Sequence, residues 1–577
     1  MKKKKLSLLW GYLQGSRGLL AFSLLSGTIS TAAKLLIPFF AGKAINVLFD
    51  EAGNKDISVY LVLMGVLLVL GTAFRYLFDY LTYLVGQRVV TRMRTAVFAS
   101  YMDANLSALD SHSEGDLTLR LMSDVENVNN GLVTGFASLY DGIISIVLTI
   151  AFMMSLNYIL GFIVIVLTPI SLLVSRFISK FNSKHYKRQG KQSGELQAFL
   201  SETLEGSESV YALGAEDERT SGFEDINEAY REATFKANMG ASIINPLTRL
   251  VNAIVNCAVL IVGALFIAGN WQVGIVFLVG DLSAFLTYAS TYTQPFNEVS
   301  SVVSEIAYAV ASFDRVSAAV DLQKEGETGQ EKIEGKVASI AADDVHFAYE
   351  DGKKEVIKGV SFALKEGQSA ALVGPTGSGK TTIISLLMRF YDPQRGGFFL
   401  GDKAASCFPR KDLRSRFGMV LQDTWIFDGT VRENIAYGKE DASLEEIKRA
   451  AHEAGASSFI DRLPNGYDTR IGNDSGLSKG ERQLLSIARV ILMDPEVVLL
   501  DEATSSIDVL TEKRLSASLE RLLAGKTSLV VAHRLSTVEH SDLILVLDGG
   551  KIVESGNHAS LLKEGGFYAS LYQAQFE

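Results

Sequence analysis

Long apolar runs fill the first 310 residues of the chain, and shorter ones follow. A helix needs about 20 mostly apolar residues to cross a bilayer. Four runs are about that long or longer: residues 18–48, 57–74, 142–175 and 250–280. The last two are free of charge and too long for one crossing, so we divide them at Ser155–Tyr158 and at Gly269–Gln272. The pattern predicts six membrane-spanning helices.

Basic residues between these runs predict the orientation. One group lies between the second and third spans and another between the fourth and fifth: Arg88, Arg92, Arg94 and Arg120, then Lys180, Lys184, Lys187, Arg188 and Lys191. Cytoplasmic loops are enriched in Lys and Arg. We therefore expect a multi-pass protein of the cytoplasmic (inner) membrane, with both termini and both long loops in the cytoplasm. Lys2–Lys5 fit this orientation, since no small-residue cleavage site of a signal peptide follows them. The loops have helical character and are expected to continue the membrane helices.

Several ionisable residues fall inside or near the predicted spans: Lys34, Arg75, Asp79, Asp141, Arg249 and Asp281. Charge is expensive in lipid, so each is either a candidate for a substrate cavity or a residue that pairs or reaches the interface. An aromatic run, Phe285, Tyr288 and Tyr292, has helical spacing. We interpret this run as packing rather than as a substrate cage.

The remainder of the chain has the composition of a soluble α/β domain. The predicted division is a membrane domain over residues 1–320, a polar linker over 321–336 and a nucleotide-binding domain over 337–577. A net charge of −10 argues against a nucleic-acid partner. Cys257 and Cys407 are too few for a disulfide framework or a zinc site, and both are expected to be packing residues.

A glycine-rich loop between a buried strand and a helix begins at Gly374. Its pattern is that of a P-loop, in which backbone N–H groups and a helix N-terminus surround phosphate oxygens. Lys380 is expected to reach the β- and γ-phosphates of ATP, and the Thr381 hydroxyl to bind Mg²⁺. The expected nucleotide-binding residues here are Gly374, Pro375, Thr376, Gly377, Ser378, Gly379, Lys380, Thr381 and Thr382.

A second apolar strand, residues 497–500, ends in two carboxylates. Phosphoryl transfer needs a metal ion that neutralises charge and a group that aligns the attacking water. Asp501 is therefore the candidate Mg²⁺ ligand, and Glu502 the candidate general base.

The segment from Gly476 to Arg489, GLSKGERQLLSIAR, resembles the signature motif of the ABC transporter family. It lies between the P-loop and the Asp-Glu strand, in the order that the family shows. Four further residues match family motifs, namely an adenine-stacking aromatic, the Q-loop, the D-loop and the switch histidine: Tyr349, Gln422, Asp508 and His533. The resemblance implies ATP and Mg²⁺ as cofactors, with Gln422 as a further metal ligand and with Gln422 and His533 acting beside Glu502 in catalysis.

The membrane half resembles that of ABC exporters. Pro38 matches the first exporter helix, and Ser113–Val125 and Gln189–Gln197 match the two coupling regions. The resemblance implies two chains whose ATPase domains close head to tail in a lipid bilayer. Ser478 and Gly480 would then contact the γ-phosphate on the partner's P-loop. The expected function is ATP-driven export of a small molecule, lipid or peptide by alternating access; a lipid flippase, an exporter-fold importer of a metal chelate, and an ATP-gated channel or regulator are the alternatives.

The signature departs from the LSGGQ pattern at two positions, Lys479 and Glu481. Tolerated variation is one interpretation. The other is a weakened signature that faces an impaired ATP site of a different chain. In heterodimeric exporters, one chain keeps its catalytic glutamate while it carries an altered signature. Because this chain resembles that pattern, with Glu502 and His533 present, we favour a heterodimer, with a homodimer as the alternative.

Overall fold

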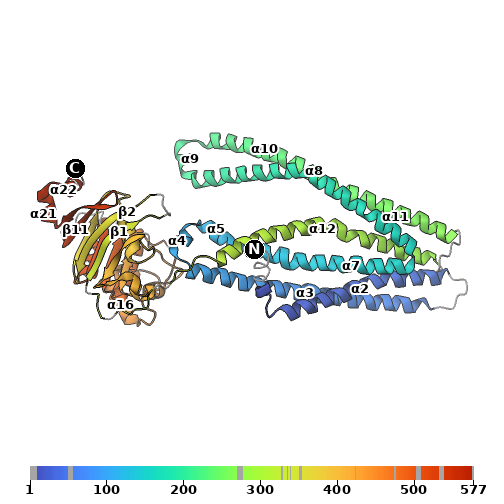
Figure 1. Cartoon of the computed structure of the whole chain (residues 1–577), viewed down its shortest axis with the longest axis horizontal. Coiled ribbons are helices and arrows are strands. Elements are labelled where there is room, and N and C mark those ends of the chain that lie inside the picture. Colours follow the sequence, from blue (N-terminus) through green and yellow to red (C-terminus); the bar gives the residue numbers. More distant parts are fainter. Residues whose placement is uncertain are drawn as a thin grey trace. The chain divides into compact units, whose positions relative to one another are not determined.

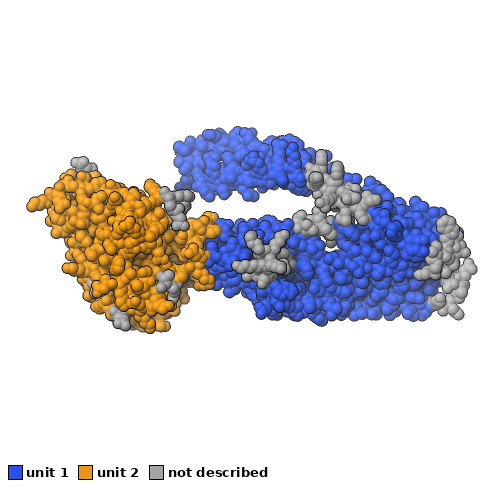
Figure 2. Space-filling model, viewed as in Figure 1, with its two compact units in different colours: residues 1–102, 114–322 blue, residues 103–113, 323–577 orange. Residues whose placement is uncertain are grey.

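The computed structural model describes residues 10–49, 56–268, 277–326, 329–333, 335–337, 339–349, 354–422, 424–472, 476–501, 509–531 and 538–574. The chain forms two compact units, one of Met1–Met102 with Glu114–Leu322 and one of Asp103–Ser113 with Gln323–Glu577 (Figure 2).

Six long helices of the first unit each carry one predicted apolar run (Figure 1). They are α2 (Arg17–Leu48), α3 (Ile57–Asp103), α7 (Gly135–Leu156), α8 (Tyr158–Glu205), α11 (Ile244–Ala268) and α12 (Val279–Val320). By length and composition, four helical stretches in the described part of the chain could cross a membrane: Arg17–Leu48, Ile57–Asp103, Glu114–Leu156 and Arg249–Ala268. A shorter apolar stretch, Tyr158–Thr168, begins α8. The shorter elements are α4 (Leu106–Asp110), α5 (Glu114–Leu119), α6 (Val125–Val128), α9 (Ser207–Leu213), α10 (Glu216–Ser242) and two π-helical segments, Arg120–Asp124 and Asn129–Thr134.

The predicted division of the third run is confirmed at Asn157. This residue separates α7 from α8, and its side chain caps α8 by accepting hydrogen bonds from the backbone N–H groups of Ile159 and Leu160, at 3.0 and 3.1 Å. The other predicted division, Gly269–Gln272, lies outside the described residues.

Helix α8 is far longer than a membrane span. It has 48 residues, which at 1.5 Å per residue is about 70 Å, whereas the hydrocarbon core is about 30 Å thick. Gln189–Gln197, expected to be a coupling region, lies within this continuous helix, and the turn of the α8–α10 hairpin falls later, at α9. The residues from Lys191 to Glu205 include many good helix formers, so the helix continues to Gly206.

The aromatic run of α12 is packed inside the membrane unit, as predicted. Phe285 and Tyr288 are fully buried. The Tyr288 hydroxyl donates to the carbonyl of Leu35 at 2.6 Å, and its ring stacks on Phe152 with centroids 5.5 Å apart. These contacts hold α12 against α2 and α7.

The second unit contains two main sheets. In the larger, the order is β12-β11-β3-β10-β9-β6, parallel except for the β11–β12 pair. Its strands are β3 (Ser369–Val373), β6 (Phe417–Val420), β9 (Val497–Asp501), β10 (Thr527–Val531), β11 (Leu543–Asp548) and β12 (Lys551–Gly556). The smaller sheet has the order β2-β1-β4-β5, with β1 (Ser339–Phe347), β2 (Ile357–Lys365), β4 (Arg395–Leu400) and β5 (Lys403–Ala404). A two-stranded pair joins β7 (Gly429–Thr430) to β8 (Arg470–Ile471).

Helices cover the larger sheet because its central strands are buried on both faces. Those in contact with its strands are α13 (Lys380–Leu387), α14 (Arg410–Ser415), α18 (Lys479–Met493) and α21 (His558–Glu564). The other helices of the unit are α15 (Val431–Ala436), α16 (Leu444–Glu453), α17 (Ser457–Ile460), α19 (Val509–Leu523) and α22 (Phe567–Ala574), with 3₁₀ turns at Ala405–Cys407 and Gly466–Asp468. Parallel strands place their carboxyl ends at one edge, where α/β proteins bind ligands.

A segment from the first third of the chain, Asp103–Ser113, groups with the second unit. Ala104 forms a bridge with Lys324, and the N–H of Asn105 donates to the carbonyl of Gln323 at 3.0 Å. The Tyr391 hydroxyl donates to the Asp110 carboxylate at the end of α4. This segment stops where the expected coupling region, Ser113–Val125, begins.

Candidate nucleotide site and membrane cavity

The glycine loop connects β3 to α13 at the carboxyl edge of the larger sheet. Gly374 and Gly379 have φ of 152° and 103°, in the region that favours glycine. A Cβ at Gly374 would lie 2.1 Å from the carbonyl oxygen of Leu547, and one at Gly379 would lie 2.6 Å from Ile357. The loop therefore tolerates only glycine at both positions.

Lys380 and Ser378 place polar groups inside this loop. The Lys380 ammonium donates to the carbonyls of Gly374 and Pro375, at 2.8 and 3.0 Å, and its side chain is buried. The Ser378 hydroxyl is also buried, without a hydrogen-bond partner among the described residues. A buried hydroxyl is costly unless it is satisfied, so Ser378 keeps a donor that a ligand of the loop could satisfy. Thr376 and Gly377 are exposed at the tip of the loop.

Thr381 and Asp501 meet at the start of α13. The Thr381 hydroxyl donates to Oδ1 of Asp501 at 3.1 Å, although the two residues are 120 positions apart. Asp501 ends β9 and is 5% exposed. Hydroxyl and carboxylate oxygens are ligands that Mg²⁺ prefers, and Mg²⁺ commonly bridges protein to phosphate. These two residues fit a Mg²⁺ ion beside a bound nucleotide.

Two of the remaining expected site residues are described by the structure, and three lie outside its described residues. Tyr349 is half-exposed, packs edge-on against Phe347 and Tyr391, and shares a hydrogen bond of 3.0 Å with the Thr382 hydroxyl. Gln422 is exposed, two residues after β6 ends at the same sheet edge. Glu502, Asp508 and His533 lie outside the described residues. The strands before two of them end side by side, since Asp501 pairs with Val531 across β9 and β10.

The signature serine forms a closed arrangement with Glu481 at the start of α18. Ser478 is the N-cap, and its hydroxyl oxygen accepts from the Glu481 N–H at 3.2 Å. The Glu481 carboxylate accepts from the N–H and the hydroxyl of Ser478, at 3.0 and 3.1 Å. Gly480 is buried beneath them. Among the described residues, the Ser478 hydroxyl hydrogen-bonds to Glu481 and to no residue of the chain's own glycine loop.

Sequence reasoning missed this capping box, although its signal was present. Ser-x-x-Glu before an apolar helix predicts reciprocal hydrogen bonds between the first and fourth residues. The unpartnered Ser378 hydroxyl, in contrast, had no signal in the sequence, because the P-loop pattern allows any residue at that position.

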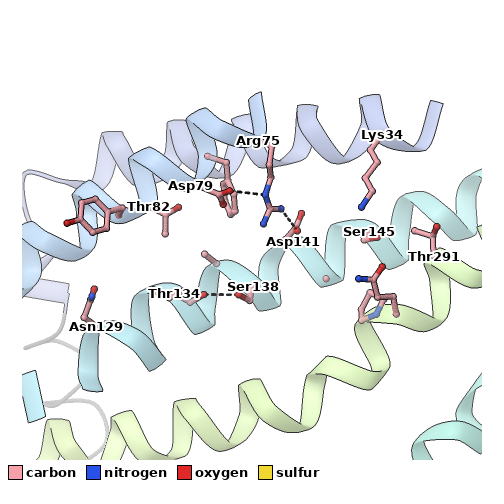
Figure 3. A pocket seen from close by; sticks show the side chains of 16 residues that line it. Lys34, Arg75, Asp79, Thr82, Asn129, Thr134, Ser138, Asp141, Ser145 and Thr291 are labelled. Atoms are coloured by element: carbon pink, nitrogen blue, oxygen red, sulfur yellow. Dashed lines mark hydrogen bonds and ion pairs between the residues drawn. The ribbon is translucent and has the colours of Figure 1, made fainter. Parts of the chain in front are cut away.

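The charged residues of the membrane helices are brought together in part (Figure 3). Arg75 donates to Asp79 at 3.1 Å and to Asp141 at 2.7 Å. Lys34 lines the same cavity, which has a volume of about 410 Å³. Asp281 lies elsewhere, 3.5 Å from Lys43, and Arg249 is exposed on α11 and does not line this cavity.

The comparisons with known proteins cover both halves. Residues 20–296 match the family model described as ABC transporter transmembrane region, and residues 357–505 match the model described as ABC transporter. An uncharacterised ABC transporter ATP-binding protein of Bacillus subtilis, YfiC, is 35% identical over all of this chain and 95% of its own length. A fatty acid ABC transporter ATP-binding/permease protein of Mycobacterium bovis is 35% identical over 85% of this chain and 77% of its own. The structure of a bacterial Atm1-family ABC exporter with ATP bound has a TM-score of 0.78 and 27% identity over 98% of both chains.

The matches run in the expected order, membrane region before ATPase, and extend over the whole chain. The fold is that of an ABC exporter, and the ATPase of this family is coupled to transport. The chain belongs to the ABC transporter family, as a half-transporter that joins one membrane region to one ATP-binding domain.

Proposed function

We propose that this chain exports a small amphipathic molecule by alternating access, with ATP hydrolysed between its own P-loop and the signature of a second chain. The supporting observation is the geometry of the sheet edge. There the Thr381 hydroxyl and Asp501 lie 3.1 Å apart at the mouth of the glycine loop, while Ser478 of the same chain is engaged with Glu481.

The residue roles follow from this edge. Lys380 would contact the β- and γ-phosphates of a bound ATP, and Thr381 and Asp501, with Gln422, would hold Mg²⁺, which would neutralise phosphate charge. Glu502 polarises the attacking water and His533 contacts the γ-phosphate, since both follow strands that end beside Asp501. Tyr349 packs against adenine, and Asp508 lies at the contact between the two ATPase domains.

The domain division that we propose remains residues 1–320, a linker over 321–336, and residues 337–577. The long basic loops and both termini lie in the cytoplasm of a cell-membrane protein. An exposed apolar tip at the end of the α8–α10 hairpin supports a second chain. Leu204, Tyr211 and Leu213 are 72, 72 and 82% exposed there, which is unusual for a surface without a partner.

The partner that we favour is a different half-transporter with a regular LSGGQ signature. The Glu481 carboxylate is hydrogen-bonded to Ser478 at the helix N-terminus that would receive a γ-phosphate. The negative carboxylate and the negative phosphate would repel each other there. The ATP site that faces this signature would bind ATP and hydrolyse it slowly. The site formed by this chain's P-loop would carry the turnover. A fatty acid relative favours an amphipathic substrate over a peptide.

Expression of the chain alone tests the choice of partner. We expect little ATPase activity and no stable dimer in size-exclusion chromatography, and recovery of both on coexpression with the partner. A homodimer with two equivalent turnover sites would overturn the heterodimer and leave the signature changes as tolerated variation.

A further inference from the structure

Four ionisable residues from three membrane helices line one cavity of the membrane unit (Figure 3). Lys34 comes from α2, Arg75 and Asp79 from α3, and Asp141 from α7. Arg75 extends between the two carboxylates and donates to both. Asp141 also accepts from the Thr31 hydroxyl at 2.8 Å, which fixes it against α2 one turn before Lys34.

The charges in this cavity balance in number but not in position. Two carboxylates share one guanidinium, so the group of Asp79, Arg75 and Asp141 carries one negative charge in excess. Lys34 carries the opposite charge, and no carboxylate lies within 4 Å of its ammonium among the described residues. Its side chain is exposed to the cavity. The cavity therefore offers a separate cation and a separate excess of negative charge.

Asp79 is the carboxylate with the greater capacity for a ligand. Its side chain is 57% exposed and its one ion-pair partner in the described chain is Arg75, whereas Asp141 is 27% exposed and has Thr31 as well. Hydroxyl and amide side chains line the rest, from Thr82, Ser138, Thr291 and Gln294. Such a set can hold a polar head group by hydrogen bonds.

A second space, with aliphatic side chains on part of its wall, adjoins the first. A second cavity of about 530 Å³ shares Lys34, Arg75 and Asp141 with the first. It also shares Ser145, Thr291 and Gln294, and its further lining joins four aliphatic side chains to four small or hydroxyl residues: Leu35, Ile37, Leu67 and Leu68, with Ser30, Thr31, Gly71 and Thr72. A molecule that occupies both spaces has a charged head and an apolar part.

We propose that this pair of cavities binds an amphiphile whose head group carries both charges, with its anionic group at Lys34 and its cationic group at Asp79. A purely anionic amphiphile would leave the excess negative charge of Asp79, Arg75 and Asp141 uncompensated. A purely cationic amphiphile would leave the positive charge of Lys34 uncompensated. Uncompensated charge is costly in a membrane interior. This inference gives the substrate class of the proposed export function and rests on it.

Equilibrium binding without nucleotide tests the proposal on the purified transporter complex in dodecyl maltoside. The labelled probes have one twelve-carbon chain each: a lysophosphatidylethanolamine (zwitterion), laurate (anion) and dodecylammonium (cation). We expect the zwitterion to bind most tightly. Lys34→Gln should weaken binding of the zwitterion about tenfold or more, which is the effect of losing a hydrogen bond to a charged group. The same variant should make the cation the preferred probe. Asp79→Asn should make the anion preferred.

Two further variants separate charge from fold. Lys34→Arg keeps the charge and should keep the wild-type order of probes. Arg249→Gln removes a cation of α11 that does not line the cavity, and should also keep that order. A wild-type preference for laurate or dodecylammonium would overturn the proposal, as would an unchanged order in both Lys34→Gln and Asp79→Asn. Absence of ATP-driven movement of the zwitterion in proteoliposomes, with the binding order as expected, would instead contradict the export function.

Discussion

Lys380 lies inside the loop that it is expected to serve, with its ammonium between two backbone carbonyls. Removal of this charge removes the group that would face the β- and γ-phosphates in a site with little water, where Coulomb interactions are strong. We expect Lys380→Ala to abolish most photolabelling of this chain by an ATP analogue. Lys365→Ala, which removes an exposed lysine at the end of β2, serves as the control and should label normally. Equal labelling of the two variants would contradict the P-loop role.

Glu481 permits a second test on a single residue. Glutamine keeps the shape of the capping box and removes the negative charge from the helix N-terminus. We expect Glu481→Gln to increase ATP occupancy at the site that faces this signature, measured as nucleotide trapped per complex. Turnover should change little if the facing site lacks its own glutamate. Unchanged trapping would mean that the carboxylate does not oppose the phosphate.

Residues differ in how well the sequence predicts them. The P-loop glycines, Asp501 and the signature serine follow from local patterns, because each depends on a strand or helix end that the sequence marks. The pairing of Arg75 with Asp79 has a local signal, i and i+4 on a helix, but its pairing with Asp141 does not. That contact depends on how α3 packs on α7, which local periodicity does not encode.

At the scale of elements, α4 and its flanking residues connect a membrane helix to the ATP-binding unit. Tyr391 donates to Asp110 here, and burial and this carboxylate raise the pKa of the tyrosine above its usual value, so the phenol stays protonated at physiological pH. A hydrogen bond to a charged group contributes about 1.5–3 kcal/mol.

The Tyr391→Phe variant removes the hydroxyl and leaves the ring. We expect it to lower substrate-stimulated ATPase activity severalfold while ATP binding stays normal, because the segment Asp103–Ser113 is held less firmly. Tyr437→Phe, which changes an exposed tyrosine on the same unit, is the control. Loss of ATP binding in Tyr391→Phe would assign the residue to the nucleotide pocket instead.

The elements themselves were predicted well where apolar runs are long. Each of the first five predicted spans corresponds to one long helix, the sixth starts outside the described residues and continues into α12, and Asn157 divides the third run where expected. The expected coupling region at Gln189–Gln197 lies within α8, because the residues before Gly206 favour a helix, and the turn of the α8–α10 hairpin follows at α9. The grouping of Asp103–Ser113 with the second unit depends on contacts more than 200 residues away, such as Asn105 with Gln323.

At the scale of the whole molecule, a half-transporter has a complete P-loop and a complete signature but does not join them. Ser478 bonds to Glu481, and Thr381 to Asp501, in separate parts of one domain. In the function that we propose, hydrolysis requires two chains, and it moves the occupant of the cavity of Lys34 and Asp79. Our central claim is that Glu502 of this chain drives this transport.

The most direct measurement is ATP hydrolysis and substrate movement by the reconstituted complex with Glu502→Gln. The amide keeps the shape of the side chain but cannot act as a base, and loss of a general base costs about 10²–10⁴-fold in rate. We predict a loss of that size in hydrolysis and the loss of transport, with ATP still bound; Glu453→Gln, an exposed change on α16, should have no effect. Near-normal hydrolysis and transport by Glu502→Gln would contradict the account.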